Sequence, residues 1–227
     1  MFRFFFGMTA KMTDVDATGR SLKENFLAVA ELKGIPRASV EDQLHRALYD
    51  LNVGADFVFA EEPDFSGYDV LLVPPLYVAG DALLQKIVDF AKGGGHVLLT
   101  LKSGFTNEWN TVRFSRAPGP LREAAGLSYQ EFSSLKEPLP LKGDPFGAGA
   151  ENKAFVWADM VLPEAAKPLA FYDHPFFGRY PALTRNAFGK GTVTYQGTVL
   201  SDALQLKLVA DVLQQAGIAP EAGLPAG

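Results

Sequence analysis

The sequence predicts an α/β fold, with a doubly wound, mostly parallel sheet covered by helices on both faces. Three short runs, at residues 55–60, 69–74 and 96–101, are apolar throughout rather than alternating. Such runs are typical of strands that are buried on both faces. Helix-like segments separate them, so strand and helix alternate along the chain. A length of 227 residues suits one large domain of this kind.

Two helices are predicted in the first half of the chain. The first spans residues 40–52, where Ser39 and Asp42 form an approximate capping box. The second spans residues 81–92 and ends at three consecutive glycines, where a left-handed helix cap requires glycine. A phosphate-binding loop follows a strand and opens a helix. This glycine run does the reverse, so it indicates a cap.

The second half is less regular. A short helix is expected over 118–125, and a stretch rich in Pro and Gly predicts a loop excursion over 137–149. Residues 186–191 should connect the last two strands as a β-hairpin, and a helix over 202–216 should close the domain. The four strand-like segments expected here are 154–160, 169–172, 182–186 and 192–198.

The ends of the chain give weaker signals. Residues 2–6 and 12–18 both remain candidates for a first strand. We therefore expect an N-terminal segment over 1–38, the main domain over 39–218 and a disordered tail over 219–227.

Composition narrows the function classes. The net charge is −5 and no stretch is strongly basic, so neither nucleic acid nor a membrane surface is an expected partner. The absence of cysteine excludes disulfides, thiolate zinc sites and a cysteine nucleophile. No His, Asp or Glu spacing suggests a metal, and no cofactor is expected. No apolar run approaches the ~18–20 residues of a membrane helix, and the apolar start is too short for a signal peptide, so a cytoplasmic protein is the simplest expectation.

Ser103 is the first catalytic candidate, because it lies just past a predicted central strand, where hydrolases and amidotransferases place a nucleophile. A nucleophile elbow needs small residues two positions before and after, but Leu101 and Phe105 stand there. The base would have to be His174, the one histidine able to approach from elsewhere. The alternative is a turn in which the serine hydroxyl binds the backbone.

The pair Asn107-Glu108 looks like the Asn-Glu that precedes the acid of many glycosidases. A glycosidase needs a second carboxyl ~5–9.5 Å away, and Glu123, Glu131 and Asp173 are only possibilities. The alternative is a loop carboxylate at Glu108 that pairs with Arg113 or Arg116. A third hypothesis is a sugar-binding module that uses aromatic stacking platforms, for which the candidates are Trp109, Tyr129 and Trp157.

Several segments in order resemble the trimerisation domain of family-42 glycoside hydrolases, the β-galactosidases. The resemblance covers residues 40–218. Its main pieces are Tyr68–Tyr77, Gly94–Phe105, Asn107-Glu108, Val112-Arg113, Pro118-Gly119 and Pro181–Gly191. It implies a flavodoxin-like fold similar to class I glutamine amidotransferases, without their catalytic cysteine.

The resemblance also implies a non-catalytic role, because the family's catalytic glutamates belong to a TIM barrel that this chain lacks. We expect an oligomerisation domain that forms a trimer or docks on a separate glycosidase subunit, and that is not an enzyme by itself. The chain looks like a detached piece of the family's longer proteins. The candidate rim residues for contacts are Asn107, Glu108 and Arg113. The alternative functions are the serine hydrolase with Ser103 and His174, and the sugar-binding module.

Overall fold

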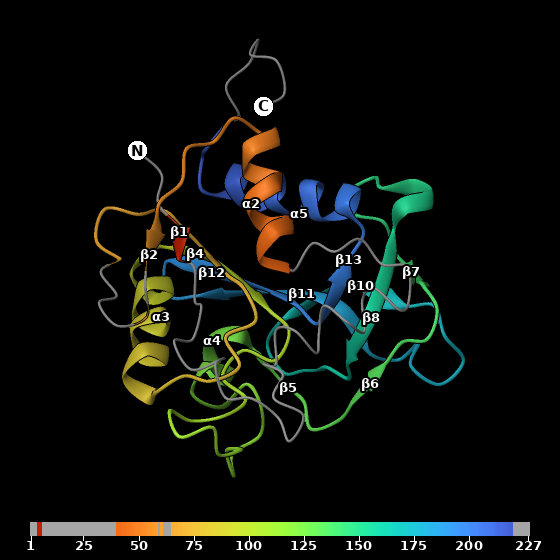
Figure 1. Ribbon diagram of the computed structural model, residues 1–227, viewed down its shortest axis with the longest axis horizontal. Helices are drawn as coiled ribbons and strands as arrows, with labels where there is room; N and C mark the ends of the chain where they lie inside the picture. The colour runs from red at the N-terminus through yellow and green to blue at the C-terminus, as the bar shows by residue number, and fades with distance from the viewer. Residues whose placement is uncertain (1–3, 6–39, 59, 61–64, 220–227) are drawn as a thin grey trace, which may run out of the picture.

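The computed structural model describes residues 4–5, 40–58, 60 and 65–219, and it places a large central sheet between helices (Figure 1). The proposed cap at Ser39, the candidate strand at 12–18 and the tail at 220–227 lie outside the described residues. Within the other candidate first strand, residues 2–6, a two-residue strand β1 (Phe4–Phe5) pairs in parallel with β2 (Phe57–Val58).

Nine strands form the central sheet, in the order β13-β8-β7-β10-β11-β12-β4-β3, with β6 added beside β8. Their bounds are β3 (Val70–Val73), β4 (His96–Thr100), β6 (Phe132–Ser134), β7 (Leu139–Lys142), β8 (Lys153–Asp159), β10 (Lys167–Tyr172), β11 (Pro181–Phe188), β12 (Gly191–Gln196) and β13 (Thr198–Leu200). A separate antiparallel pair joins β5 (Leu127–Ser128) to β9 (Leu162–Pro163).

The prediction of a mostly parallel sheet is wrong. Within the nine-stranded sheet only β3–β4 and β4–β12 pair in parallel, and the remaining neighbours are antiparallel. The physical reason lies in the connections after α4, where no helix long enough for a parallel crossover separates successive strands. Short connections permit only antiparallel neighbours. The hairpin between β11 and β12 turns in two residues, as expected for the C-terminal hairpin.

The predicted loop excursion at 137–149 is also partly wrong, because β7 lies inside it and pairs with β8 and β10. Pro140 sits in that strand, and proline within a run argues against an interior strand. The short β6 was not predicted either.

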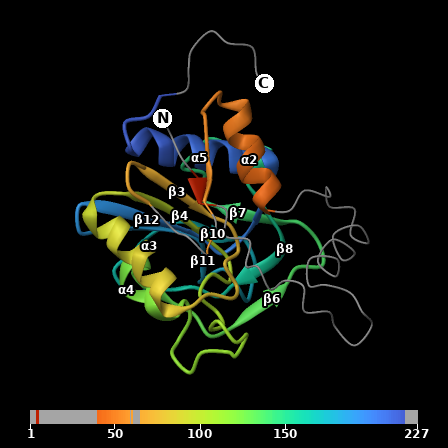
Figure 2. The ribbon, with the colours of Figure 1, turned by 60° about the vertical axis from the view of Figure 1, so that its left-hand side comes forward.

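Helices cover both faces of the sheet. The helices α2 (Val40–Asp50) and α5 (Asp202–Gln215) cover one face, and α3 (Asp81–Gly93) and α4 (Arg122–Ala125) cover the other (Figures 1 and 2). Two short 3-10 turns, η1 (Gly119–Leu121) and η2 (Gly149–Glu151), also lie in the described part of the chain. In the described part of the chain, no helix is long and apolar enough to cross a membrane.

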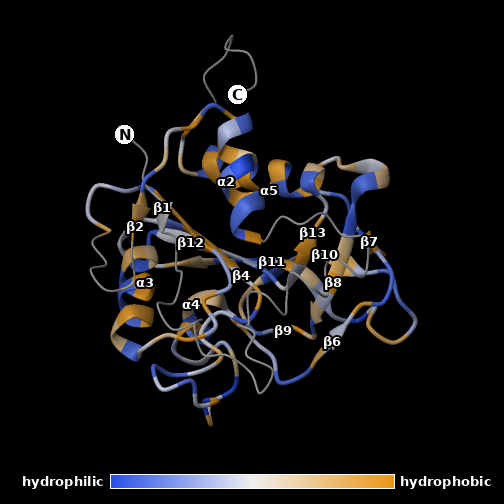
Figure 3. Ribbon diagram, viewed as in Figure 1, coloured by the Kyte–Doolittle hydropathy of each residue, from blue (hydrophilic) through white to orange (hydrophobic). Residues whose placement is uncertain are grey.

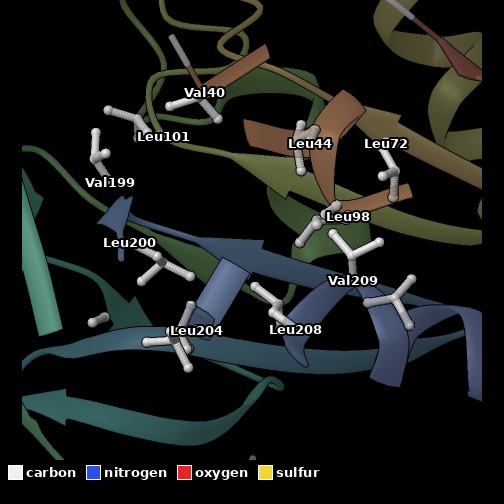
Figure 4. Close-up of a cluster of buried hydrophobic side chains, with 14 of the residues drawn as sticks. Val40, Leu44, Leu72, Leu98, Leu101, Val199, Leu200, Leu204, Leu208 and Val209 are labelled. Carbon is white, nitrogen blue, oxygen red and sulfur yellow. The ribbon is translucent and has the colours of Figure 1, made fainter. Parts of the chain in front are cut away.

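Side chains alternate between two hydrophobic cores, which explains the continuous apolar runs. On β4, Leu98 enters the core beneath α2 and α5, whereas Val97 and Leu99 enter the core beneath α3 and α4. Figure 4 shows Leu98 with Leu72 in the first core, facing leucines of α2 and α5. Figure 3 shows hydrophobic and hydrophilic residues on different parts of α3, as expected of a helix with one buried face.

The caps explain where two of the helices stop or start. Gly94 follows α3 with a φ of 127°, and its N–H bonds the carbonyls of Phe90 and Ala91, so the predicted glycine cap is confirmed. Ser201 precedes α5, and its side chain accepts a hydrogen bond of 3.1 Å from the Leu204 N–H.

Candidate functional site

The turn after β4 carries the residues that the sequence singled out. Ser103 is completely buried, and its hydroxyl donates to the Thr100 carbonyl at 2.8 Å and accepts from the Leu76 N–H at 3.2 Å. These bonds tie the turn to the segment that follows β3. Both partners are backbone groups, so the hydroxyl stabilises the turn in the way that serine does in tight loops.

The structure does not bring Ser103 and His174 together. Ser103 follows β4 and His174 follows β10, and both strands end at the same edge of the sheet. However, β11 and β12 lie between them. Three strand spacings of ~4.8 Å separate the two strand ends by about 14 Å. A general base must lie within ~3.2 Å of its nucleophile, or one water further away.

Lys102, the residue before Ser103, was missed by sequence reasoning. It takes the left-handed conformation with a φ of 57°, which is uncommon for a residue with a Cβ. Its ammonium lies among four aromatic rings, with the Nζ atom 4.0 to 5.3 Å from their centroids. The rings are those of Trp157, Phe132, Phe105 and Tyr77. We call this group the aromatic box.

The rings of the aromatic box also support one another. Phe132 stacks on Trp157 with centroids 4.6 Å apart, and Tyr77 stacks on Phe105 at 5.3 Å. A cation above aromatic faces is stabilised by about 0.5–2 kcal/mol, more where water is excluded. Burial lowers the pKa of Lys102, while the charge of Asp159 opposes that shift. The attraction to the rings favours the charged ammonium further.

Asp159, at the end of β8, is the second residue that the sequence did not reveal. The carboxylate is fully buried and accepts hydrogen bonds from the Tyr195 hydroxyl at 2.7 Å, the Trp157 indole at 2.8 Å and the Lys102 N–H at 3.4 Å. Burial raises the pKa of Asp159 to about 6, although these bonds and the Lys102 charge oppose the rise. Burial, with the nearby Asp159 charge, raises the pKa of Tyr195 well above its ordinary value, so its hydroxyl remains a donor.

A carboxyl with a pKa near neutrality is a functional-site signal in general. In this protein it lies beneath the aromatic box, with no exposed surface. The only sequence clue was an acidic residue at the end of an apolar run that predicts a strand. Its hydrogen bonds fix the Trp157 indole and the left-handed turn at Lys102, so its visible effect is to hold the aromatic box in shape.

The proposed rim residues lie on one projecting loop, residues 106–116, which we call the rim loop (yellow-green at the lower edge of Figure 1). Asn107 organises it, because its side-chain oxygen accepts from the N–H groups of Trp109 at 3.0 Å and Thr111 at 2.9 Å. An antiparallel bridge between Thr106 and Val112 closes the base of the loop.

Arg113 anchors the rim loop to the start of α3, and Glu108 lies near the same helix end. Arg113 is largely buried, forms an ion pair with Asp81 and donates to the Ala79 carbonyl at 2.6 Å. Glu108 lies beside Gly80, the N-terminal cap residue of α3, where a negative charge is favourable. Arg113 is thus bonded to Asp81 and not to Glu108, the partner that the sequence suggested.

The anchored rim loop carries three exposed apolar side chains, which we call the rim-loop apolar residues. Phe114 is fully exposed, Trp109 is 75% exposed and Val112 is 55% exposed. The other two proposed sugar platforms lie elsewhere. Tyr129 is completely buried, and Trp157 stacks inside the aromatic box. Among the residues that the structure describes, no group of three or more His, Cys, Asp or Glu side chains is placed to hold a metal.

Comparison with known proteins gives a family. The family model described as "Beta-galactosidase trimerisation domain" matches residues 24–219, and so begins earlier than the resemblance seen in the sequence. Two curated relatives are β-galactosidase BgaA of a Planococcus species, 31% identical over 87% of this chain, and β-galactosidase BglY of Alicyclobacillus acidocaldarius, 33% identical over 77%. The chain spans only 30% and 26% of their lengths.

Solved structures agree on the fold. A β-galactosidase from the Antarctic haloarchaeon Halorubrum lacusprofundi superposes with a TM-score of 0.76 at 25% identity, covering 100% of this chain and 32% of that one. A cold-adapted β-galactosidase from Rahnella sp. R3 superposes with a TM-score of 0.81 at 23% identity, again over 100% of this chain and 32% of that one. In both cases the similarity covers about a third of the larger protein.

Proposed function

Because the chain belongs to the family of β-galactosidase trimerisation domains, we propose that it is a non-catalytic domain that associates with copies of itself, as a trimer. The observation that carries this proposal is the rim loop, which is firmly anchored and yet exposes three apolar side chains within six residues. Large apolar side chains exposed close together mark contact surfaces.

The size of the rim-loop apolar residues fits an interface core. A large aromatic side chain buries ~150–250 Å² when it is covered, so Trp109 and Phe114 together with Val112 supply about half of the ~800 Å² that each partner contributes to a standard interface. The loop is also preorganised by Asn107 and Arg113, which lowers the entropy lost on association.

The turn after β4 supports the absence of catalysis. Ser103 is buried and bonded to the backbone, and the nearby Asp159 has no exposed surface. The parallel strands β3, β4 and β12, with helices on both faces, favour a relationship of this half of the sheet to flavodoxin-like and class I amidotransferase-like folds. The rest of the sheet departs from that pattern.

Sedimentation of the purified chain over a hundredfold concentration range tests the proposal. A trimer that dissociates on dilution is the expected result. A strict monomer at the highest concentration would refute it. Hydrolysis of a chromogenic galactoside by the pure chain would refute the non-catalytic part separately.

Docking on a separate glycosidase subunit is the second candidate. The same rim-loop apolar residues favour it, because exposed apolar side chains can be covered by a different protein as well as by a copy of this chain. In sedimentation it predicts a monomer that forms a complex only when the barrel subunit is added.

A further inference from the structure

A hollow lies at the end of β10, far along the sheet from the turn after β4. It measures about 760 Å³ and is lined by Lys142, Asp173, His174, Pro175, Phe176, Gly178 and Arg179. Small-molecule sites usually measure ~300–1,000 Å³. We call this the His174 hollow; its loop is the cyan loop at the right of Figure 1. Neither the self-association proposal nor the family match assigns it a role.

The loop that forms the His174 hollow is rigid. The Gly178 N–H bonds the His174 carbonyl at 2.8 Å, and the Tyr180 N–H bonds the Phe177 carbonyl at 2.8 Å. A Cβ at Gly178 would lie 2.6 Å from the His174 carbonyl oxygen, so only glycine fits this tight turn. A preorganised loop loses little entropy when it binds a ligand.

The His174 ring has a defined orientation and a defined tautomer. Its Nδ1 atom accepts the N–H groups of Phe176 at 3.1 Å and Phe177 at 3.2 Å, and the ring stacks on the Phe177 ring with centroids 4.1 Å apart. Because Nδ1 accepts hydrogen bonds, the ring proton of the neutral imidazole is on Nε2. His174 therefore presents an N–H donor from a fixed ring at the lining of the hollow.

Two cations and one carboxylate accompany this donor. Lys142 pairs with Asp173 at 3.1 Å, and Arg179 donates one of its five N–H groups to the Tyr180 hydroxyl at 2.6 Å and lies over that ring. The lining thus carries a local excess of positive charge in a protein whose net charge is −5. Guanidinium and ammonium groups in such numbers suit an anionic group such as a phosphate or a carboxylate.

The remaining lining suits a hydroxylated ring. The Phe176 ring is 79% exposed beside the cations and offers an apolar face. The Asp173 carboxylate is an acceptor only, so it can accept hydrogen bonds from the hydroxyl groups of a ligand but cannot bind the ligand's anionic group.

We propose that the His174 hollow is a binding site for a sugar that carries one anionic group, a sugar phosphate or a sugar acid. Arg179, Lys142 and the His174 Nε2–H hold the anion, Asp173 accepts from the hydroxyl groups, and the sugar ring stacks on Phe176. This goes beyond self-association and does not depend on it.

Titration calorimetry with the full chain tests the site. The probes are galactose 6-phosphate, galacturonate, neutral galactose and inorganic phosphate. We expect at least one of the two anionic sugars to bind at least tenfold more tightly than both galactose and inorganic phosphate, with weaker binding at high salt. The stronger of the two identifies the anion as phosphate or carboxylate. The proposal would be overturned if the neutral and anionic sugars bound equally. It would also be overturned if neither anionic sugar bound at 10 mM, which is roughly the upper limit of the dissociation constant for a specific site.

Three variants and one control variant locate the binding. Arg179→Gln should weaken binding of the anionic sugar at least tenfold. Lys190→Gln is the control, because it removes the same charge from the β11–β12 hairpin at the other edge of the sheet, and it should leave the affinity unchanged. Phe176→Ala should weaken binding of the sugars but leave binding of inorganic phosphate unchanged. His174→Asn keeps an acceptor oxygen for the two loop N–H groups and removes the Nε2–H donor, so affinity should fall while the fold persists. An unchanged affinity in Arg179→Gln would overturn the assignment.

The association state is separated from ligand binding by one further titration. The variant with both Trp109 and Phe114 replaced by Ser, which alters only the rim loop, should bind the anionic sugar as tightly as the wild type. Loss of sugar binding in this variant would overturn the claim that the hollow acts by itself. Loss of self-association with sugar binding retained would leave the inference intact.

Discussion

The rim loop gives the sharpest prediction. Replacing both Trp109 and Phe114 by Ser removes two exposed aromatic rings without changing charge, and neither ring contributes to a hydrophobic core. If each ring buries ~150 Å² in the assembly, the area alone corresponds to about 4 kcal/mol per ring at ~25 cal/mol/Å². Truncating a residue at the centre of an interface commonly costs about 2 kcal/mol or more of binding free energy. We therefore expect each substitution to weaken the subunit contact roughly 30- to 700-fold.

Sedimentation equilibrium measures this directly, over a range that brackets wild-type dissociation. Tyr49→Ser is the matched control, since Tyr49 is 57% exposed on α2, on the opposite face of the sheet from α3. Urea unfolding should show a change below about 0.5 kcal/mol for all variants in the monomeric state, because surface substitutions rarely cost more. If the double variant assembles as tightly as the wild type, or if Tyr49→Ser disrupts assembly equally, the rim loop is not the contact surface.

Three further predictions concern the turn after β4 and its surroundings. The pKa of Asp159 is raised in the folded state from 3.8 to about 6, so the folded state holds that proton more tightly than the unfolded chain. The contribution of this carboxyl to the free energy of unfolding therefore falls by about 3 kcal/mol as pH rises from about 4 to above 6. In urea unfolding, Asp159→Asn should gain that amount of stability relative to wild type across this range, and a pH-independent difference would contradict the reasoning. Gly104→Ala should lower the free energy of unfolding by more than about 2 kcal/mol, because φ is +70° and the new Cβ would meet a backbone carbonyl at 2.6 Å. Its control, Gly67→Ala, has a φ of +79° and nothing within 4 Å, so it should cost only about 1 kcal/mol. Equal costs would show that the structure relieves the contact at Gly104. Lys102→Met keeps the apolar stem but removes the cation, so thermal unfolding should report a loss of about 1–2 kcal/mol and Trp157 fluorescence should change, while exposed Lys136→Met should do neither.

The sequence determined the elements whose signal is local. The apolar runs that became β3 and β4, the helix α3 and its glycine cap, and the closing helix α5 were all located from composition and periodicity. Each depends on nearby residues, since a strand covered on both faces needs apolar side chains throughout and a left-handed cap needs glycine. The family resemblance was also visible, because it rests on short motifs in a fixed order.

The tertiary structure decided how the strands pair and which side chains meet. Hydrogen bonds between strands depend on the path of the whole chain. The residues of a strand such as β8 therefore do not indicate whether its neighbours are parallel or antiparallel. The aromatic box joins Tyr77, Lys102, Phe132 and Trp157 across 80 residues of sequence, and the carboxylate of Asp159 becomes buried only when those segments close around it. A local pattern encodes burial and turns, whereas contacts between distant residues exist only after the sheet has set the distances between its strands.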